Sequence, residues 1–190
     1  MTEPSQRLSH FVAGDQGPWL ILNDIALVGE ALPRAKRLQM SGPVAPERNG
    51  AVDWHLQGMT SHDRYVTREE KRLLIARQPE PGRPGASLAA FIGLRKNPQW
   101  WALTQDERRD VIEGQSRHIA IGMRYLPAIA RRLFHCRDLA TPQPFDFLTW
   151  FEYAPEDAQA FDELLGLLRA SAEWQFVERE VDLRMRRVDE

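Results

Sequence analysis

The chain has 190 residues, of which 43% are hydrophobic and 27% charged, and its formal net charge is −2. These values are typical of a globular protein with its own core, and they give no electrostatic reason to expect a nucleic-acid partner. The single cysteine, Cys136, excludes an internal disulfide and a thiolate-rich metal site, so we expect a reducing, cytoplasmic location. The N-terminus lacks a signal-peptide pattern, and Asn23 and Asp24 interrupt the apolar stretch 19–29, so we expect no membrane association.

The first half of the chain is predicted to contain short strands and one helix. Alternating apolar residues predict three strands: 11–13, 54–59 and 86–94. Thr67 and Glu70 have the spacing of a capping box, which predicts a helix that begins after Thr67. Proline and glycine predict loops at 41–50 and 78–85, and the second loop separates an N-terminal part from a longer C-terminal part.

The second half shows clearer periodicity. Thr104 and Glu107 form another capping-box pattern, and the apolar residues that follow predict one helix that continues to about Pro127. A second helix is predicted to begin at Pro155, with an apolar stripe from Phe161 to Leu168. Strands are predicted at 131–139, 145–152 and 174–185, the middle one with an aromatic face. This order of elements predicts an α+β fold in which helices cover one face of antiparallel sheets.

Two residues of the second half could carry chemistry. His118 falls within the helix predicted from Thr104, and Gly122 one turn later leaves room beside a flat ligand. A helical histidine can bind iron through one ring nitrogen while the other donates to a carboxylate, although a structural histidine bonded to a backbone carbonyl fits equally. Arg131 precedes the aromatic strand and could hold a small oxyanion, or it could form a surface ion pair with Asp138.

Several other enzyme classes lack support because their short sequence motifs are absent. The sequence contains no HExxH, GxSxG, P-loop or GxGxxG pattern, so metallopeptidase, serine hydrolase and nucleotide-binding functions lack support. From the residues alone, the chain is an α+β domain with a possible histidine-bound ligand.

Longer segments resemble the chlorite dismutase family, which also includes the coprohaem decarboxylases. The resemblance is carried by RHIAIGMRYLPAIARRLFHCRD at 117–138 and FDFLTWFEYAPED at 145–157. It extends through RYVTREEK, RKNPQWWALTQDER and FDELLGLLRASAEWQFVERE, and covers roughly residues 54–183. The resemblance implies two ferredoxin-like lobes that form a dimeric α+β barrel: a reduced N-terminal lobe at 1–85 and a haem-binding lobe at 86–190.

The resemblance also implies a site. His118 matches the proximal ligand of the haem iron, Glu173 the acid that hydrogen-bonds this histidine, and Arg131 the catalytic distal arginine, whereas Arg132 matches a basic position outside the pocket. Thr149 and Phe151 match residues of the distal pocket. Lys96, Trp100 and Tyr65 match groups around the haem propionates, and Trp101 is a further implied haem neighbour.

An arginine at the distal position favours chlorite chemistry within this family. The resemblance therefore implies a homodimeric haem b oxidoreductase, a chlorite O2-lyase that converts chlorite to chloride and dioxygen with formation of an O–O bond. Three other interpretations stay open: a coprohaem decarboxylase, a non-catalytic haem carrier or sensor, and a haem-free dimer that binds another small molecule.

Overall fold

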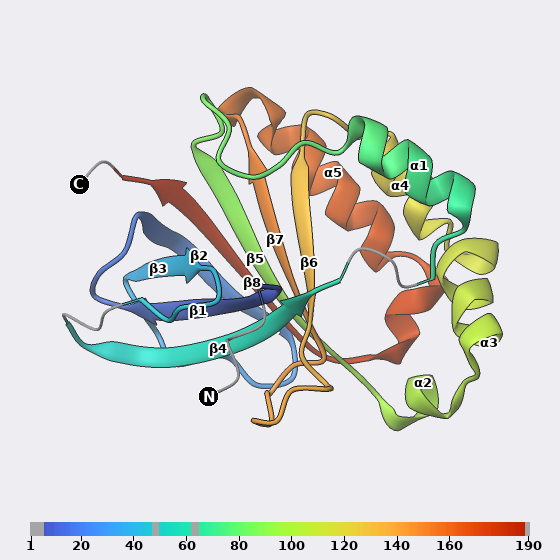
Figure 1. Ribbon diagram of the computed structural model, residues 1–190, viewed down its shortest axis with the longest axis horizontal. Coiled ribbons are helices and arrows are strands. Elements are labelled where there is room, and N and C mark those ends of the chain that lie inside the picture. The colour runs from blue at the N-terminus through green and yellow to red at the C-terminus, as the bar shows by residue number, and fades with distance from the viewer. Residues whose placement is uncertain (1–5, 47–49, 62–64, 189–190) are drawn as a thin grey trace.

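Eight antiparallel strands close into a barrel in the computed structural model, which describes residues 6–46, 50–61 and 65–188. The strands are β1 (Leu8–Gly14), β2 (Trp19–Val28), β3 (Arg37–Ser41), β4 (Val52–Thr60), β5 (Leu88–Lys96), β6 (Ala130–His135), β7 (Phe147–Tyr153) and β8 (Val177–Arg187). Their order around the barrel is β1-β3-β2-β8-β5-β7-β6-β4. The predicted α+β class is confirmed, since helices accompany this antiparallel barrel (Figure 1).

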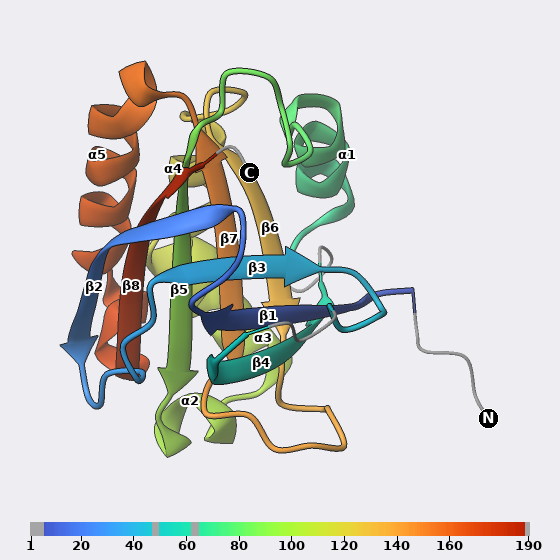
Figure 2. The same cartoon turned by 90° about the vertical axis from the view of Figure 1, so that its left-hand side faces the viewer.

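The helices gather on one side of the barrel. They are α1 (Arg68–Arg77), α2 (Pro98–Ala102), α3 (Gln105–Arg109), α4 (His118–Met123) and α5 (Ala158–Arg169). Figure 1 shows α1, α3, α4 and α5 beside β5, β6 and β7, whereas the turned view of Figure 2 shows β1, β3 and β4 crossing the barrel without a covering helix. The C-terminal part of the chain therefore has an extra layer in which a ligand site can form.

Strand β7 is buried on both faces, so it belongs to two cores. All seven of its residues are buried. Leu148 and Trp150 pack inside the barrel with aromatic residues such as Phe11 and Phe91. On the opposite face, Phe151 belongs to the apolar cluster that includes α5. The aromatic face predicted from the sequence is therefore the face that β7 turns towards the helices.

Helix α5 attaches to this outer face through the predicted apolar stripe. Its buried residues are Phe161, Leu164, Leu165 and Leu168. The ring of Phe161 stacks on Tyr153 of β7 with centroids 4.4 Å apart. The helix is preceded by a 3₁₀ turn, Pro155–Asp157, so proline stands at the start of the helical segment as the sequence predicts.

Strands β2 and β3 were not predicted from the sequence, and the last predicted strand begins too early in the chain. In β2, the pairing with β8 shifts register between Ile21 and Asn23 and again between Ala26 and Val28, which breaks the two-residue periodicity. The predicted strand 174–185 begins instead at Val177, because Ala172–Phe176 forms the 3₁₀ turn η3. Within the described ranges, no helix has the length and apolar character needed to cross a membrane.

A close contact between β4 and β6 yields a test of the barrel packing. A Cβ atom at Gly58 would lie 2.6 Å from Cβ of Phe134, which is fully buried. Gly58→Ala is expected to lower the free energy of unfolding by about 1–3 kcal/mol, since a packed core must shift to admit the methyl group. Urea denaturation measures the change.

Gly166→Ala is the matched control for Gly58→Ala. Gly166 lies in α5, and a Cβ there would meet nothing within 4 Å. Because alanine favours a helix over glycine, this substitution should raise the free energy of unfolding by about 1 kcal/mol. Equal effects of the two substitutions would contradict the packing described for β4 and β6.

Candidate functional site

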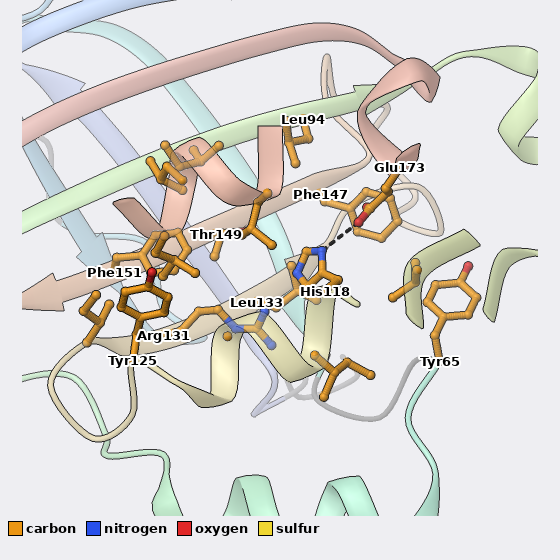
Figure 3. A pocket seen from close by; sticks show the side chains of 18 of the residues that line it. Tyr65, Leu94, His118, Tyr125, Arg131, Leu133, Phe147, Thr149, Phe151 and Glu173 are labelled. Carbon is orange, nitrogen blue, oxygen red and sulfur yellow. Dashed lines mark hydrogen bonds and ion pairs between the residues drawn. The ribbon is translucent and has the colours of Figure 1, made fainter. Parts of the chain in front are cut away.

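A cavity lies between the strands β5, β6 and β7 and the surrounding helices. It encloses about 1320 Å³, including its open mouth, and apolar side chains form most of its wall. Helices α4 and α5 contribute residues from one side and α1 contributes Leu74 from another. Figure 3 shows His118, Arg131, Thr149 and Phe151 around this space. The fold thus brings together residues from 118 to 151, and Glu173, which is more distant in the sequence, also lines the cavity.

A break in the predicted helix places His118 at the edge of the cavity. The capping box of Thr104 and Glu107 is present, but α3 ends at Arg109 and a π-helix, Asp110–Gln115 (η1), follows. Arg117 then adopts a left-handed conformation with φ of 53°, and α4 begins at His118. The prediction of one helix from Thr104 to Pro127 is therefore wrong, and His118 is the first residue of a new helix. Gly114, a weak helix former in the middle of the predicted segment, is the signal for this break.

The His118 imidazole is held by a buried carboxylate. Its Nδ1 lies 2.7 Å from Oε2 of Glu173, and Nζ of Lys96 lies 2.9 Å from the other carboxylate oxygen. The backbone amide of Glu173 donates to Oγ of Ser116 at 2.8 Å, which ties η3 to the segment before α4. Because the carboxylate favours a proton on Nδ1, the lone pair of Nε2 is left for a ligand on the cavity side.

Glu173 and Lys96 form an ion pair away from bulk water. The two residues are 5% and 3% exposed. Burial alone would raise the pKa of Glu173, but the neighbouring His118 and Lys96 and their hydrogen bonds bring this pKa well below its ordinary value. The Lys96 ammonium also lies 4.8 Å from the ring centroid of Trp100. Glu173 therefore remains a carboxylate, and Lys96 balances its charge.

Arg131 projects into the cavity from β6. Alternation along this strand turns Arg131 and Leu133 towards the cavity, while Arg132 pairs with Glu80 outside it. Burial lowers the pKa of Arg131, and the charge of Glu173 partly opposes this effect. A guanidinium nevertheless stays cationic in proteins. Among the described residues, no side chain accepts a hydrogen bond from this guanidinium within bonding distance. The cavity thus contains a cation that lacks an acidic partner in the described part of the chain.

Neighbouring polar groups on Tyr65 and Trp100 lack partners at the wall of the cavity in the described structure. The hydroxyl of Tyr65 and Nε1 of Trp100 are buried without a hydrogen-bond partner in the described structure. Their rings make an edge contact with centroids 6.0 Å apart, so the two donors belong to one region. Buried donors are rarely left unsatisfied, which points to an acceptor on a ligand.

Besides His118, the resemblance implies eight site residues, and seven of them line this cavity. The seven are Tyr65, Lys96, Trp100, Arg131, Thr149, Phe151 and Glu173, and His118 lines the cavity as well. Trp101 does not: its Nε1 donates to Asp146 at 3.3 Å and its ring stacks on Phe147 with centroids 6.1 Å apart. Trp101 therefore does not line the cavity itself, but it contacts Phe147, which does. The chemical roles of all these residues stay predictions.

Sequence reasoning missed other residues of the cavity wall. Gln78 lines the cavity and its Nε2 donates to the backbone carbonyl of Arg131, while Tyr125 approaches from the segment after α4. Leu133 could have been found from the alternation that also places Arg131. Gln78 has no such signal, because it follows a helix whose docking onto β6 is set by tertiary contacts.

The fold and the site together define a closed-barrel protein whose apolar cavity is lined by a histidine–carboxylate–lysine network. The chain matches no protein-family model. It is similar to the dimeric chlorite dismutase from Nitrobacter winogradskyi, with 50% identity, a TM-score of 0.86, and coverage of 95% of this chain and 99% of that one. This chain belongs to the chlorite dismutase family.

More distant structures share the fold. Chlorite dismutase from Candidatus Nitrospira defluvii in complex with imidazole has 18% identity, a TM-score of 0.66, and coverage of 95% of this chain and 92% of that one. A variant of the same protein in complex with cyanide has 19% identity and a TM-score of 0.68, and the match covers 100% of this chain and 96% of the other. At these identities the likeness establishes the fold.

The ionised state of Glu173 makes a prediction for acid stability. Its pKa in the folded protein lies below the ordinary value of 4.5, so its contribution is fully present above that value. As the pH falls below about 4.5 the unfolded chain takes up the proton first, and stability is lost until the folded carboxylate is protonated as well. Chemical denaturation from about pH 7 to about pH 3 should show a steeper fall in the free energy of unfolding for the native protein than for Glu173→Gln.

At neutral pH, Glu173→Gln should lower the free energy of unfolding by about 3 kcal/mol or more, because it leaves Lys96 buried without a counter-charge. Glu178→Gln is the control, since Glu178 pairs with Arg95 at the surface, where the two side chains are 37% and 53% exposed. That change should cost less than about 1 kcal/mol. Similar losses for both variants would contradict the buried pair.

Proposed function

We propose that this chain is a haem b chlorite dismutase, a chlorite O2-lyase that converts chlorite to chloride and dioxygen. The observation that carries the proposal is the Arg131 guanidinium, which has no acidic partner among the described residues, in the same apolar cavity as an imidazole whose Nδ1 is already bonded to Glu173. The imidazole suits a metal ligand, and the cation suits a small anion. Membership of the chlorite dismutase family supports both assignments.

The residues of the cavity fit a haem. His118 would hold the haem iron through Nε2, and Gly122, one turn later on α4, borders the cavity with open space where a side chain would stand. The buried donors of Tyr65 and Trp100 can satisfy the propionate carboxylates of the porphyrin. The wall is mostly apolar, as a large flat macrocycle requires.

Lys96 takes a different part from the one implied by the resemblance. Its ammonium is committed to Glu173, so we assign it to the network that holds His118 rather than to a propionate. The paired carboxylate keeps the proton on Nδ1 and makes the imidazole a stronger electron donor. Thr149 and Phe151 lie on the strand face beside Arg131 and would limit the space that a substrate can occupy next to it.

Arg131 binds the substrate. Bound haem would supply a ferric iron that can assist the breaking of both Cl–O bonds of chlorite and the formation of one O–O bond, so that ClO2− becomes Cl− and O2. Arg131 would offset the charge of the incoming anion in a poorly solvated cavity. Its charge-assisted hydrogen bonds would keep the chlorine-containing group in the cavity until both oxygen atoms have left as dioxygen and chlorine as chloride.

We also propose the assembly and location that the resemblance implies. The Nitrobacter winogradskyi protein is described as dimeric, which supports a homodimer here. Four of the exposed large apolar residues, Leu22, Ile25, Leu27 and Val28, lie on β2 and form the kind of surface that a second copy can cover. The strand order β8-β5-β7-β6, with helical segments after β5 and β7, supports a ferredoxin-like C-terminal lobe at 86–190, and β1–β4 would form the reduced lobe at 1–85. A cytoplasmic location rests on the lone cysteine.

Arg131→Ala tests the substrate role. The variant should bind haem normally, yet lose roughly tenfold to hundredfold in kcat/KM for chlorite, as expected when hydrogen bonds to a charged group are removed. It should also release hypochlorite, which a chlorination trap detects, while an oxygen electrode measures dioxygen. Arg131→Lys keeps the charge without the paired hydrogen-bond geometry, so its kcat/KM for chlorite should fall between those of the native protein and Arg131→Ala.

Arg132→Ala is the matched control, because Arg132 is the neighbouring residue and pairs with Glu80 outside the cavity. It should retain the activity of the native protein. Equal activities of Arg131→Ala and the native protein would remove Arg131 from the mechanism. A native protein that converts coprohaem but releases no dioxygen from chlorite would instead identify a decarboxylase.

His118→Ala tests the haem ligand. Without the imidazole, haem should be lost or bound weakly, and the Soret band of the purified protein should shrink and shift. His55→Ala is the control, since His55 lies on β4 and bonds to His10 at 2.9 Å, apart from the cavity lining. A full complement of haem with an unchanged spectrum in His118→Ala would overturn the assignment.

A further inference from the structure

The helix that begins with His118 has no cap at its own N-terminus. The residue at the N-cap position is Arg117, in a left-handed conformation and without a side-chain hydrogen bond to the helix. An arginine side chain carries only donors, so it cannot accept from the first amides of α4. These amides need acceptors from another part of the chain.

Glu113 supplies them from the preceding π-helix. One carboxylate oxygen accepts from the amide of Ile119 at 2.7 Å, and the other lies 3.3 Å from the amide of Ala120. These are the second and third residues of α4, the amides that an N-cap side chain normally binds. A carboxylate at this end of a helix is also favoured by the helix dipole.

The shape of η1 makes this contact possible. The left-handed turn at Arg117 directs α4 away from the path of η1, and the backbone amide of Arg117 donates to the carbonyl of Glu113 at 3.2 Å. The chain therefore folds back so that the side chain of Glu113 reaches the beginning of the next helix. Helix α4 is only six residues long and has no fully buried residue, so it has little other means to fix its position.

We propose that Glu113 is a positioning residue for His118 and, by capping α4, sets where the imidazole stands against the haem iron. Glu173 fixes the imidazole through Nδ1, whereas Glu113 fixes the backbone from which the imidazole projects. The inference rests on the proposed role of His118 as the haem ligand. Its structural part concerns the protein alone and can be tested without haem.

The first measurement is amide hydrogen exchange in the haem-free protein. Glu113→Ala should accelerate exchange at Ile119 and Ala120 by about tenfold, the change that corresponds to loss of a typical helix cap. Glu113→Gln keeps one acceptor oxygen and should restore part of the protection. Unchanged exchange at both amides in Glu113→Ala would overturn the proposal, whatever the protein binds.

The second measurement uses the haem-loaded protein. In Glu113→Ala, the iron–histidine stretching band of the ferrous form should shift or broaden, and haem should transfer to apomyoglobin several-fold faster, with Glu113→Gln closer to the native protein. If Glu113→Ala alters amide exchange but keeps the native iron–histidine band and the native rate of haem transfer, then Glu113 caps the helix without positioning His118. That result would also overturn the proposal. A native protein that takes up no haem would refute the proposed function while the exchange result still decides whether the cap exists.

Glu107→Ala is the matched control. Glu107 accepts from the backbone amide of Thr104 at 2.7 Å in the capping box of α3, so its removal also takes a glutamate from the start of a helix. It should lower stability to a similar extent without changing the iron–histidine band or the exchange at Ile119 and Ala120. The same spectral change in both variants would reduce the role of Glu113 to general stability.

Discussion

The carboxylate of Glu173 is the interaction on which the site depends. It is buried, and its two oxygens are bound to different partners, Lys96 and His118, which come from β5 and α4. A buried carboxylate without these partners would be protonated or would destabilise the fold. The strand, the 3₁₀ turn and the short helix must therefore come together in one arrangement, and this arrangement directs the imidazole towards the cavity.

Periodicity predicted helix α5 and strand β7. The apolar stripe of α5 faces the sheet, and along β7 the residues that face the barrel interior alternate with residues that face the helices. The bulged strand β2 and the break before His118 were not predicted, since both depend on local backbone irregularities that interrupt a period. The site residues followed from the family resemblance, whereas the commitment of Lys96 to Glu173 required the tertiary structure.

The closed barrel explains why the cavity can be both open and stable. The interior is filled by aromatic residues such as Phe11, Phe91 and Trp150, so the sheet does not need the cavity side for its own core. The helices cover the outer face of the sheet. Helix α5 packs closely there through its buried residues, whereas α1 has no buried residue and packs less closely. A large ligand can therefore contribute the missing contacts between the sheet and the helices.

The two charged sides of the cavity differ in how completely they are satisfied. The imidazole belongs to a network in which each carboxylate oxygen of Glu173 has a partner. Arg131, by contrast, is held by its strand and by Gln78 at its backbone carbonyl, and within the described residues its guanidinium has no acceptor. Desolvating an unpaired cation is unfavourable, and an anion that enters the cavity relieves that cost. The imidazole is thus fixed and the guanidinium is available to an anion, which is the division of roles that the proposed chlorite turnover would require.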